Sequence, residues 1–317
     1  MISNFVFHRV SDNQNGLWPP MNTKLFEKCI YYIQKKFHVV LFEDLVQQDL
    51  MHFSPLSNQK RRIATIMFDD GYKDNIEYAV PILKKYNLKA SFYVITNCID
   101  KNIPTWDYNI EWVLKHTKRD KIILNFDFIP KNLQVIQLTS IEKRLFFIKK
   151  LKPLLKKLSH DKRNQILKYV FEKCNDVESP KLMMNWNDLR CLKSEGHYIG
   201  SHSVNHSILG NMLNIKDLTF EIQHSGYKIQ EKLGHFPITF SYPFGSYNDL
   251  VKKIIFDSGY KIGLATKQDV YKPYKDNLLE IPRIELYNES WSKTLLRISN
   301  ILEKIKYAVG YKIIKNL

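Results

Sequence analysis

Two adjacent aspartates, Asp69 and Asp70, end an apolar run of the chain, and Gly71 follows them. The run at 63–68 has the composition of a buried β-strand. Two like charges this close raise each other's pKa unless a positive partner lies between them. A divalent metal ion is a common partner of this kind in proteins. The pair therefore raises the question of whether the chain carries further metal ligands.

Two histidines are the next candidates, because His202 and His206 follow directly on the apolar segment Tyr198–Ser201. A separation of four residues places two imidazoles on one side of a helical turn, which is the spacing of many zinc sites. One carboxylate and two imidazoles leave coordination positions open for water and substrate, as a catalytic site needs. If Asp70 binds the metal ion, Asp69 is free to act as a general base.

A third element is the segment Phe240–Gly245, where an apolar run ends in a turn fixed by Pro243 and Gly245. Such a turn can direct a backbone N–H toward a developing oxyanion. It is equally compatible with an ordinary strand-exit turn. Because active sites of α/β proteins form at the carboxyl ends of the strands, we expect the aspartates, the histidines and this turn to lie together.

The elements that must position these residues alternate between β-type runs and helical patterns. We expect strands at 5–8, 39–42, 63–68, 90–95, 198–201, 239–242, 260–265 and 282–286. We expect helices at 75–86, 187–194, 215–233 and from about 248 to 259, with Asn or Gly at several of their ends. Repeated βα units predict an α/β protein with a mostly parallel sheet, either open or closed into a barrel.

Two segments stand apart from this pattern. The Lys-rich segment 97–180 reads as a helical insertion into a domain that spans 1–289, with helices at 141–157 and 162–174. The final segment, 290–317, reads as a basic amphipathic helix. Its apolar residues at helical spacing are Trp291, Leu295, Ile298, Leu302 and Ile305. Such a helix either packs on its own domain or lies on a membrane surface.

Composition limits the possible partners of this chain. Its 317 residues are 44% hydrophobic and 25% charged, which is typical of a soluble globular protein. The net charge of +16 reflects either Lys-rich solvated faces or attraction to an anionic membrane or glycan. No nucleic-acid-binding motif is present, so we expect no nucleic acid partner.

The expected location is cytoplasmic, either free or peripheral at the inner face of the membrane. The first nine residues lack the charge and apolar pattern of a secretory signal, and no apolar run reaches the length of a membrane span. The four cysteines are scattered and form no C-x-x-C motif, so they read as reduced thiols: Cys29, Cys98, Cys174 and Cys191.

The three elements, in this order, resemble the motifs of the polysaccharide deacetylase (NodB-homology) family, carbohydrate esterase family 4. Its first motif, T-F-D-D-G, matches residues 67–71 except at the leading Thr, and its second, H-[ST]-x-x-H, matches 202–206. Its third, R-x-P-[FY]-G, matches 241–245 except at the Arg, where Ser241 stands. The resemblance covers about 60–95 and 183–286.

The resemblance implies a deformed (β/α) barrel and metal-dependent removal of acetyl groups from sugars. Asp69 would be the general base, and the metal ligands would be Asp70, His202 and His206. The N–H of Phe244 would help to hold the oxyanion. The cofactor would be a divalent ion, with Zn²⁺ as the first candidate.

Two departures from the family pattern need replacements. Members with the motif Arg use it to hold the base aspartate, which we expect Ser241 not to do; Arg283, from another strand, is the candidate substitute. The late Leu-x-His, whose His protonates the leaving amine in many members, is missing. A branch that acts on biofilm poly-N-acetylglucosamine uses an N-terminal Tyr-His segment instead, and 7–9 resembles it. We therefore expect His8 to be the general acid.

The expected substrate is an N-acetylated amino sugar in a glycan or lipid-linked glycan, an intermediate of cell-surface polysaccharide synthesis. Candidate residues for stacking against the sugar are Trp106, Trp186 and Tyr242, which as buried aromatics would equally serve the core. Three alternatives remain: an O-acetyl esterase or other amide hydrolase, an iron oxygenase with two histidines and one carboxylate, and a non-catalytic glycan-binding or membrane-associated protein.

Overall fold

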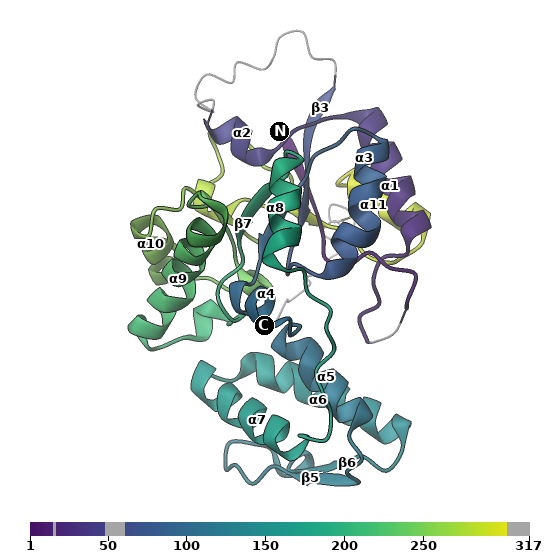
Figure 1. The fold of residues 1–317 in the computed structure, drawn as a ribbon, viewed down its shortest axis with the longest axis vertical. Helices are drawn as coiled ribbons and strands as arrows, with labels where there is room; N and C mark the ends of the chain where they lie inside the picture. The colour runs from purple at the N-terminus through teal and green to yellow at the C-terminus, as the bar shows by residue number, and fades with distance from the viewer. Residues whose placement is uncertain (15–16, 48–60, 303–317) are drawn as a thin grey trace.

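Short apolar segments pair side by side into one curled sheet. The structure, a computed structural model, describes residues 1–14, 17–47 and 61–302 (Figure 1). Within these residues the sheet has eight strands in the order β10-β1-β3-β4-β7-β8-β9, with β2 also paired to β3, and every pairing between them is parallel.

The strands of this sheet are β1 (Ile2–Phe7), β2 (Phe37–Val39), β3 (Arg62–Phe68), β4 (Ser91–Val94), β7 (Tyr198–Ser201), β8 (Thr239–Ser241), β9 (Ile262–Leu264) and β10 (Ile284–Glu285). The helices around it are α1 (Thr23–Lys36), α2 (Phe42–Gln47), α3 (Val80–Lys85), α4 (Thr96–Lys101), α8 (Trp186–Ser194), α9 (Ile215–Leu233), α10 (Asp249–Asp257) and α11 (Trp291–Ile298). Short turns of helix join them in the described residues, namely η2 (Asn75–Ala79), η4 (Leu209–Asn211), η5 (Pro243–Gly245) and η6 (Leu278–Glu280).

The two ends of the sheet approach each other. A parallel bridge joins Leu264 of β9 to Ile281, and the N–H of Ala265 donates to the carbonyl oxygen of Ile281 at 2.9 Å. The sheet thus curls into a half-barrel, which confirms the predicted deformed (β/α) barrel. Its curl brings the carboxyl ends of β1, β3, β7, β8 and β10 around one space, because all of these strands run in the same direction.

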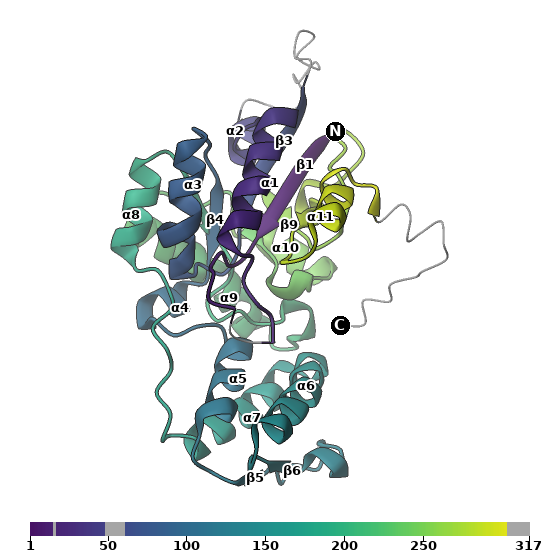
Figure 2. The ribbon, with the colours of Figure 1, turned by 90° about the vertical axis from the view of Figure 1, so that its right-hand side faces the viewer.

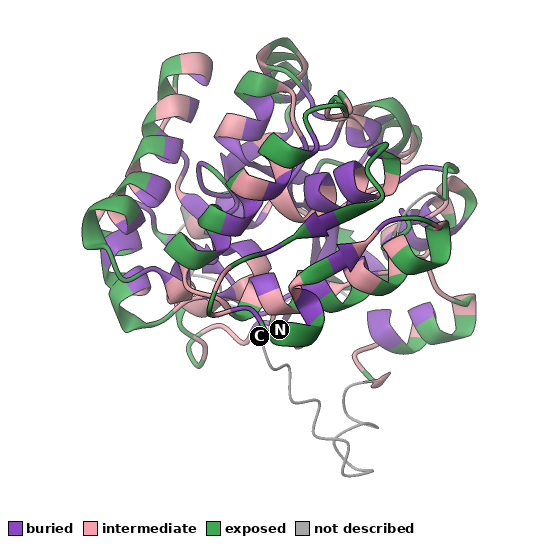
Figure 3. Ribbon diagram, turned by 90° about the horizontal axis from the view of Figure 1, so that it is seen from below, coloured by how far each residue is buried: buried purple, intermediate pink, exposed green. Residues whose placement is uncertain are grey.

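The helices cover the sheet with their apolar faces. In α1 the buried residues recur at helical spacing, namely Leu25, Phe26, Cys29, Ile30 and Ile33. They pack with β1 and β3 in one apolar core, to which α3 and α8 also contribute. Figure 3 shows the same pattern in other helices, with buried residues turned inward and exposed residues outward.

Several predicted boundaries shift once the sheet is formed. The predicted strand 39–42 is found at 37–39, where Phe37 pairs with Arg62 of β3, and Phe42 begins α2 instead. The predicted helix 75–86 begins with one turn of π-helix before α3. The strand β2 forms because it pairs with β3. This contact is distant in sequence, so no local pattern predicts it.

The insertion forms a second group of elements below the sheet in Figures 1 and 2. Its elements are α5 (Trp106–His116), β5 (Lys121–Ile123), η3 (Lys131–Leu133), β6 (Val135–Gln137), α6 (Ile141–Lys157) and α7 (His160–Lys173). It has its own apolar core, with buried residues from Ile110 to Cys174. The antiparallel pair β5–β6 was not predicted, since the segment was expected to be mostly helical.

The predicted helix 290–317 is wrong in its extent, because α11 ends at Ile298 and Asn300 after it has a left-handed φ of 55°. The helix α11 packs on the sheet domain. Ile298 is buried in the core that α1 and β1 share, and Trp291 lies edge-on to Tyr32 with ring centroids 5.8 Å apart. Residues 303–317, which include Ile305 of the predicted helix, lie outside the described residues. Within the described chain, the expected contact with an anionic membrane has no support, and no helix is long and apolar enough to cross a bilayer.

Candidate active site

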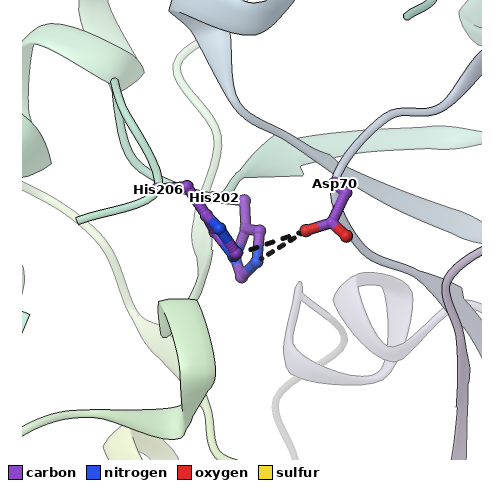
Figure 4. Close-up of side chains that lie close together, drawn as sticks. All are labelled: Asp70, His202 and His206. Carbon is purple, nitrogen blue, oxygen red and sulfur yellow. Dashed lines mark ion pairs between the residues drawn. The ribbon is translucent and has the colours of Figure 1, made fainter. Parts of the chain in front are cut away.

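Three buried side chains converge at the carboxyl ends of β3 and β7. Nε2 of His202 and Nε2 of His206 each lie 3.4 Å from Oδ1 of Asp70, and Figure 4 shows both rings beside the carboxylate. One ligand atom from each residue lies within 4.8 Å of the others. A carboxylate oxygen and two imidazole nitrogens are a donor set that suits a divalent metal ion. The structure thus brings the three predicted ligands together.

The two histidines do not lie on a helical turn, so that part of the prediction is wrong. Ser203 and His206 have φ values of 69° and 58°. These values are left-handed and cannot occur inside a right-handed helix. The N–H of His206 donates to Oγ of Ser203 at 3.0 Å, which closes the loop after β7. Asp70 also has a positive φ, 74°. The rings therefore meet through a tight loop rather than through helical spacing.

A buried glutamate that the sequence analysis missed supports this loop. Oε2 of Glu221, on α9, accepts the N–H groups of Val204 and Asn205 at 3.1 and 2.9 Å, and its Oε1 accepts the Ser207 hydroxyl at 2.9 Å. Such charge-assisted hydrogen bonds are stronger than neutral ones. The sequence signal that could have revealed Glu221 is a carboxylate among the apolar positions of helix 215–233. Its hydrogen bonds to the histidine loop explain why this carboxylate is buried.

The charges around the three ligands fit a cation. Oδ1 of Asp70 is buried and has no hydrogen-bond partner among the described residues. Burial raises the pKa of Asp70, but His202, His206 and His8 outweigh it and hold that pKa well below its usual value. Burial lowers the pKa of His206 to about 4, so its ring is neutral near pH 7. A buried anionic oxygen beside a neutral imidazole is an arrangement that a divalent ion completes.

The second ring nitrogen differs between the two imidazoles, because that of His202 makes a hydrogen bond and that of His206 makes none among the described residues. Nδ1 of His202 donates to the carbonyl oxygen of Ser241 at 2.7 Å, which directs Nε2 at Asp70. Nδ1 of His206 lies 3.9 Å from Oδ1 of Asp107. Burial lowers the pKa of His202, but the charges of Asp69 and Asp70 outweigh this effect, so the pKa lies above its usual value. A bound cation would therefore replace a proton on His202.

Asp69 is held by the arginine that the sequence analysis suggested. Nη1 and Nη2 of Arg283 donate to Oδ1 and Oδ2 of Asp69 at 2.9 and 2.8 Å. Nε of Arg283 donates to the carbonyl oxygen of Ala265 at 3.0 Å, and both charged side chains are buried. Burial raises the pKa of Asp69, but Arg283, followed by His202, outweighs it, so the pKa lies below its usual value. Asp69 is therefore ionised at neutral pH.

Ser241 also contacts the base candidate, so the expectation that it does not hold Asp69 is wrong. Its hydroxyl donates to Oδ2 of Asp69 at 3.1 Å. Ser241 supplies one hydrogen bond from a neutral hydroxyl, whereas Arg283 supplies two hydrogen bonds and a charge. Ser241, at the motif position, thus contacts Asp69, and the positive charge comes instead from Arg283.

His8 lies where β1 ends, next to the aspartates. The register of β1 and β3 pairs Phe7 with Phe68, so His8 is level with Asp69. Nδ1 of His8 lies 3.7 Å from Oε1 of Glu285, and its ring meets the edge of Trp18 at 4.7 Å between centroids. Glu285 and Trp18 were missed by the sequence analysis. Glu285 lies on β10 and Arg283 directly precedes this strand, so one short segment brings both side chains to the site.

The turn after β8 places Phe244 against the histidines. Its ring centroid is 4.4 Å from that of His206, and its φ of 56° is left-handed. Gly245 follows with a φ of 66°, and a Cβ there would clash with the side chain of Thr266, so glycine is required. The N–H of Phe244 lies early in a single helical turn, where such groups lack acceptors within the turn.

These residues line a cavity of about 700 Å³, within the range of small-ligand sites. The sheet domain contributes His8, Asp69, Asp70, His202, His206 and Phe244, and the insertion contributes residues of α5 and α6. Of the three aromatics predicted to stack on a sugar, Tyr242 lines the cavity. Trp106 instead donates its Nε1 hydrogen to the carbonyl oxygen of His206, and Trp186 to Asp100. The aromatic lining includes three missed residues: Trp18, Tyr72 and Tyr108.

The fold is a curled α/β sheet, and its cavity contains a buried cluster of one carboxylate and two imidazoles. This combination is typical of metal-dependent hydrolases. Comparison with known sequences agrees with this class, because the profile of the polysaccharide deacetylase family matches residues 57–263. The chain belongs to the polysaccharide deacetylase family. None of the curated proteins matches this chain.

Solved structures share the fold at low sequence identity. A Streptococcus pyogenes deacetylase, PplD, described in complex with acetate, is 18% identical, with a TM-score of 0.60 over 94% of this chain and 97% of that one. A de-N-acetylase from Aggregatibacter actinomycetemcomitans is 15% identical, with a TM-score of 0.58 over 94% and 99% of the two chains. IcaB from Ammonifex degensii is 13% identical, with a TM-score of 0.58 over 94% and 96%.

If the cluster holds a divalent ion, its two aspartates must respond differently to loss of charge. Asp70→Asn should weaken zinc binding by at least about a hundredfold, because it removes a ligand rather than a supporting group. Asp69→Asn should leave zinc affinity near that of the wild type. Zinc titration against a competing chelator measures both, and equal affinities for all three proteins would contradict this ligand assignment.

If Arg283 keeps Asp69 ionised, its replacement must shift the pH dependence of turnover. Arg283→Met removes the charge that lowers the pKa of Asp69, so the acidic limb of kcat should move up by about 1–3 pH units. Arg283→Lys keeps a charge and should shift the limb less. Ser241→Ala loses one hydrogen bond to Asp69 but no charge, so it should shift the limb less than Arg283→Met. An unchanged profile in a folded Arg283→Met protein would rule out this role.

Proposed function

We propose that this protein is a metal-dependent hydrolase that removes the N-acetyl group from an amino sugar of a glycan. The observation that carries the proposal is the division of the two adjacent aspartates. Asp70 faces His202 and His206, whereas Asp69 is paired with Arg283 at 2.8 Å. One carboxylate is thus available to a cation and the other to a proton, which is what hydrolysis of an unreactive amide needs.

A divalent ion held by Asp70, His202 and His206 would supply a Lewis acid for the acetyl carbonyl and would make water more acidic. Zinc is our first candidate because nitrogen and carboxylate oxygen are among its common ligands. Asp69 then accepts the proton of the attacking water. Arg283 keeps this carboxylate ionised and fixes its orientation before the reaction, so no reorganisation is needed at that step.

His8 is our candidate for the donor of a proton to the departing amine. It lies on the cavity wall, and Glu285 faces its Nδ1. The hydroxyl of Tyr287 and the side chain of Gln268 in turn donate to Glu285. With Glu285 beside Nδ1, the Nε2 atom of the ring is the one left to act on the substrate.

The N–H of Phe244 is our candidate donor to the oxyanion. The left-handed conformation of this residue and the glycine after it fix the peptide next to His206. A backbone donor in a rigid turn is already in place before charge develops on the oxygen, which is the basis of this type of stabilisation.

An N-acetylated sugar is the substrate we favour over other acetylated compounds. Two structures with the same fold are described as a deacetylase in complex with acetate and as a de-N-acetylase. Both are less than 20% identical to this chain, so they supply the class of reaction and not the substrate. We further propose that the sugar belongs to an intermediate of cell-surface polysaccharide synthesis, handled in the cytoplasm.

Assay of the zinc-loaded protein on N-acetylglucosamine oligosaccharides tests the reaction. Acetate and free amine should appear in equal amounts, and Asp69→Asn should abolish both while it keeps the metal ion, because the proton acceptor is lost. Acetate from O-acetylated but not N-acetylated sugars would instead identify an esterase. Oxygen consumption with ferrous iron would indicate an oxygenase, and no turnover with any metal ion would favour a binding protein.

If His8 is the general acid, its loss must affect turnover without affecting the metal site. His8→Ala should lower kcat by about 100- to 10,000-fold, since this is the usual contribution of a positioned acid. Zinc content should stay at the wild-type level. His224→Ala, an exposed histidine of α9, is the matched control. Loss of zinc in His8→Ala would make His8 a ligand, and an unchanged kcat would remove it from the mechanism.

A further inference from the structure

A row of lysines on α6 lines one side of the cavity, where Lys152 and Lys156 are half-buried and Lys149 and Lys157 are exposed. The helix buries Ile148, Leu151 and Leu155 in the core of the insertion. A neighbouring face carries the residues that line the cavity, at spacings of three and four: Lys149, Lys152, Pro153, Lys156 and Lys157. Four lysines on one face of a helix repel one another, so this arrangement is unfavourable without a negative partner.

The carboxylates of the cavity neutralise this row only in part, because most of them face partners outside α6. Asp69 faces Arg283, Asp70 faces His202 and His206, and Glu285 faces His8. Glu111 pairs with Lys152 of the row as well as with Lys115, and the charge of Asp107 acts on Lys156. Among the described residues, Lys149, Lys156 and Lys157 have no carboxylate partner. One side of the cavity therefore keeps a surplus of positive charge.

Lys156 connects this row to the catalytic cluster. Its Nζ lies 4.4 Å from the ring centroid of Phe244, which is itself 4.4 Å from the ring centroid of His206. The ammonium is thus within about 9 Å of the His206 ring, a reach comparable with the width of one sugar. The backbone carbonyl of Lys156 accepts the side-chain N–H of Asn211 at 3.1 Å, which fastens this end of α6 to the sheet domain.

From these observations we propose that the α6 lysines bind a phosphate or diphosphate group carried by the acetamido sugar. This rests on the proposed function, which it deepens by naming the substrate class: a glycosyl phosphate or diphosphate. A phosphate group carries about −1.5 to −2 charges, which matches two or three unpaired lysines. Lysine suits phosphate as a point charge with three donors, whereas paired recognition of a carboxylate favours arginine. Such a group is attached to the sugar and enters the cavity with it.

Isothermal titration of the zinc-loaded protein with N-acetylglucosamine and with N-acetylglucosamine 1-phosphate tests this inference at low salt. The wild type should bind the phosphorylated sugar at least about tenfold more tightly, and added salt should reduce the difference. The double variant Lys149→Gln, Lys156→Gln should lose the preference. Lys150→Gln is the matched control, because Lys150 is an exposed lysine of the same helix and does not line the cavity.

Equal affinity of the wild type for the two sugars, or an unchanged preference in the double variant, would overturn the inference. Tighter binding of an N-acetylglucosamine–uronic acid disaccharide than of the phosphate would also overturn it. If the double variant does not fold, each single variant should lose part of the preference. Nucleoside diphosphate-linked and short-chain polyprenyl diphosphate-linked N-acetylglucosamine, titrated in the same way, distinguish the two sources of the phosphate.

Binding also separates this inference from the proposed function. A lysine-dependent phosphate preference without release of acetate from any sugar would keep the phosphate site and reject the deacetylase. Release of acetate from unphosphorylated sugars, with no preference for phosphate, would do the reverse.

Discussion

Two carboxylates that are adjacent in sequence and buried at the end of one strand cannot share one compensating charge. The structure resolves this by turning them in different directions. Asp70 adopts a φ of 74° and faces two imidazoles, whereas Asp69 meets the guanidinium of Arg283. Removing either partner would leave a buried charge uncompensated, which is costly in a protein interior. The rest of the site depends on this separation of the two charges.

The curled parallel sheet supplies the partners because it gathers strand ends that are far apart in the chain. β1 lies between β3 and β10, so His8, Asp69 and Arg283 become neighbours although the chain separates the last two by 214 residues. The loop after β7 brings the histidines from the other side. The insertion then adds a wall to this site, since α5 and α6 contribute a large part of the cavity lining.

The regular elements of the fold were largely predictable from local pattern. Helices with a clear apolar face were located well, and 141–157 and 215–233 coincide with α6 and α9. Errors fell where a distant contact decides the structure. β2 exists through its pairing with β3, and the β5–β6 hairpin through a core that only the folded insertion has. The histidine loop was predicted as a helical turn, because sequence spacing carries no information about the left-handed residues within it.

The sequence by itself determined the types of chemical group in the site: two aspartates after an apolar strand, a histidine pair and a Pro–Phe–Gly turn. These signals are local, since each depends on residues within one short segment and on the strand that precedes it. Only the tertiary structure decided how they are partnered. That Arg283 and Ser241 both hold Asp69, that Glu285 faces His8 and that α6 presents lysines to the cavity all follow from contacts between distant segments. Such contacts are set by sheet order and packing, which no single segment of the sequence contains.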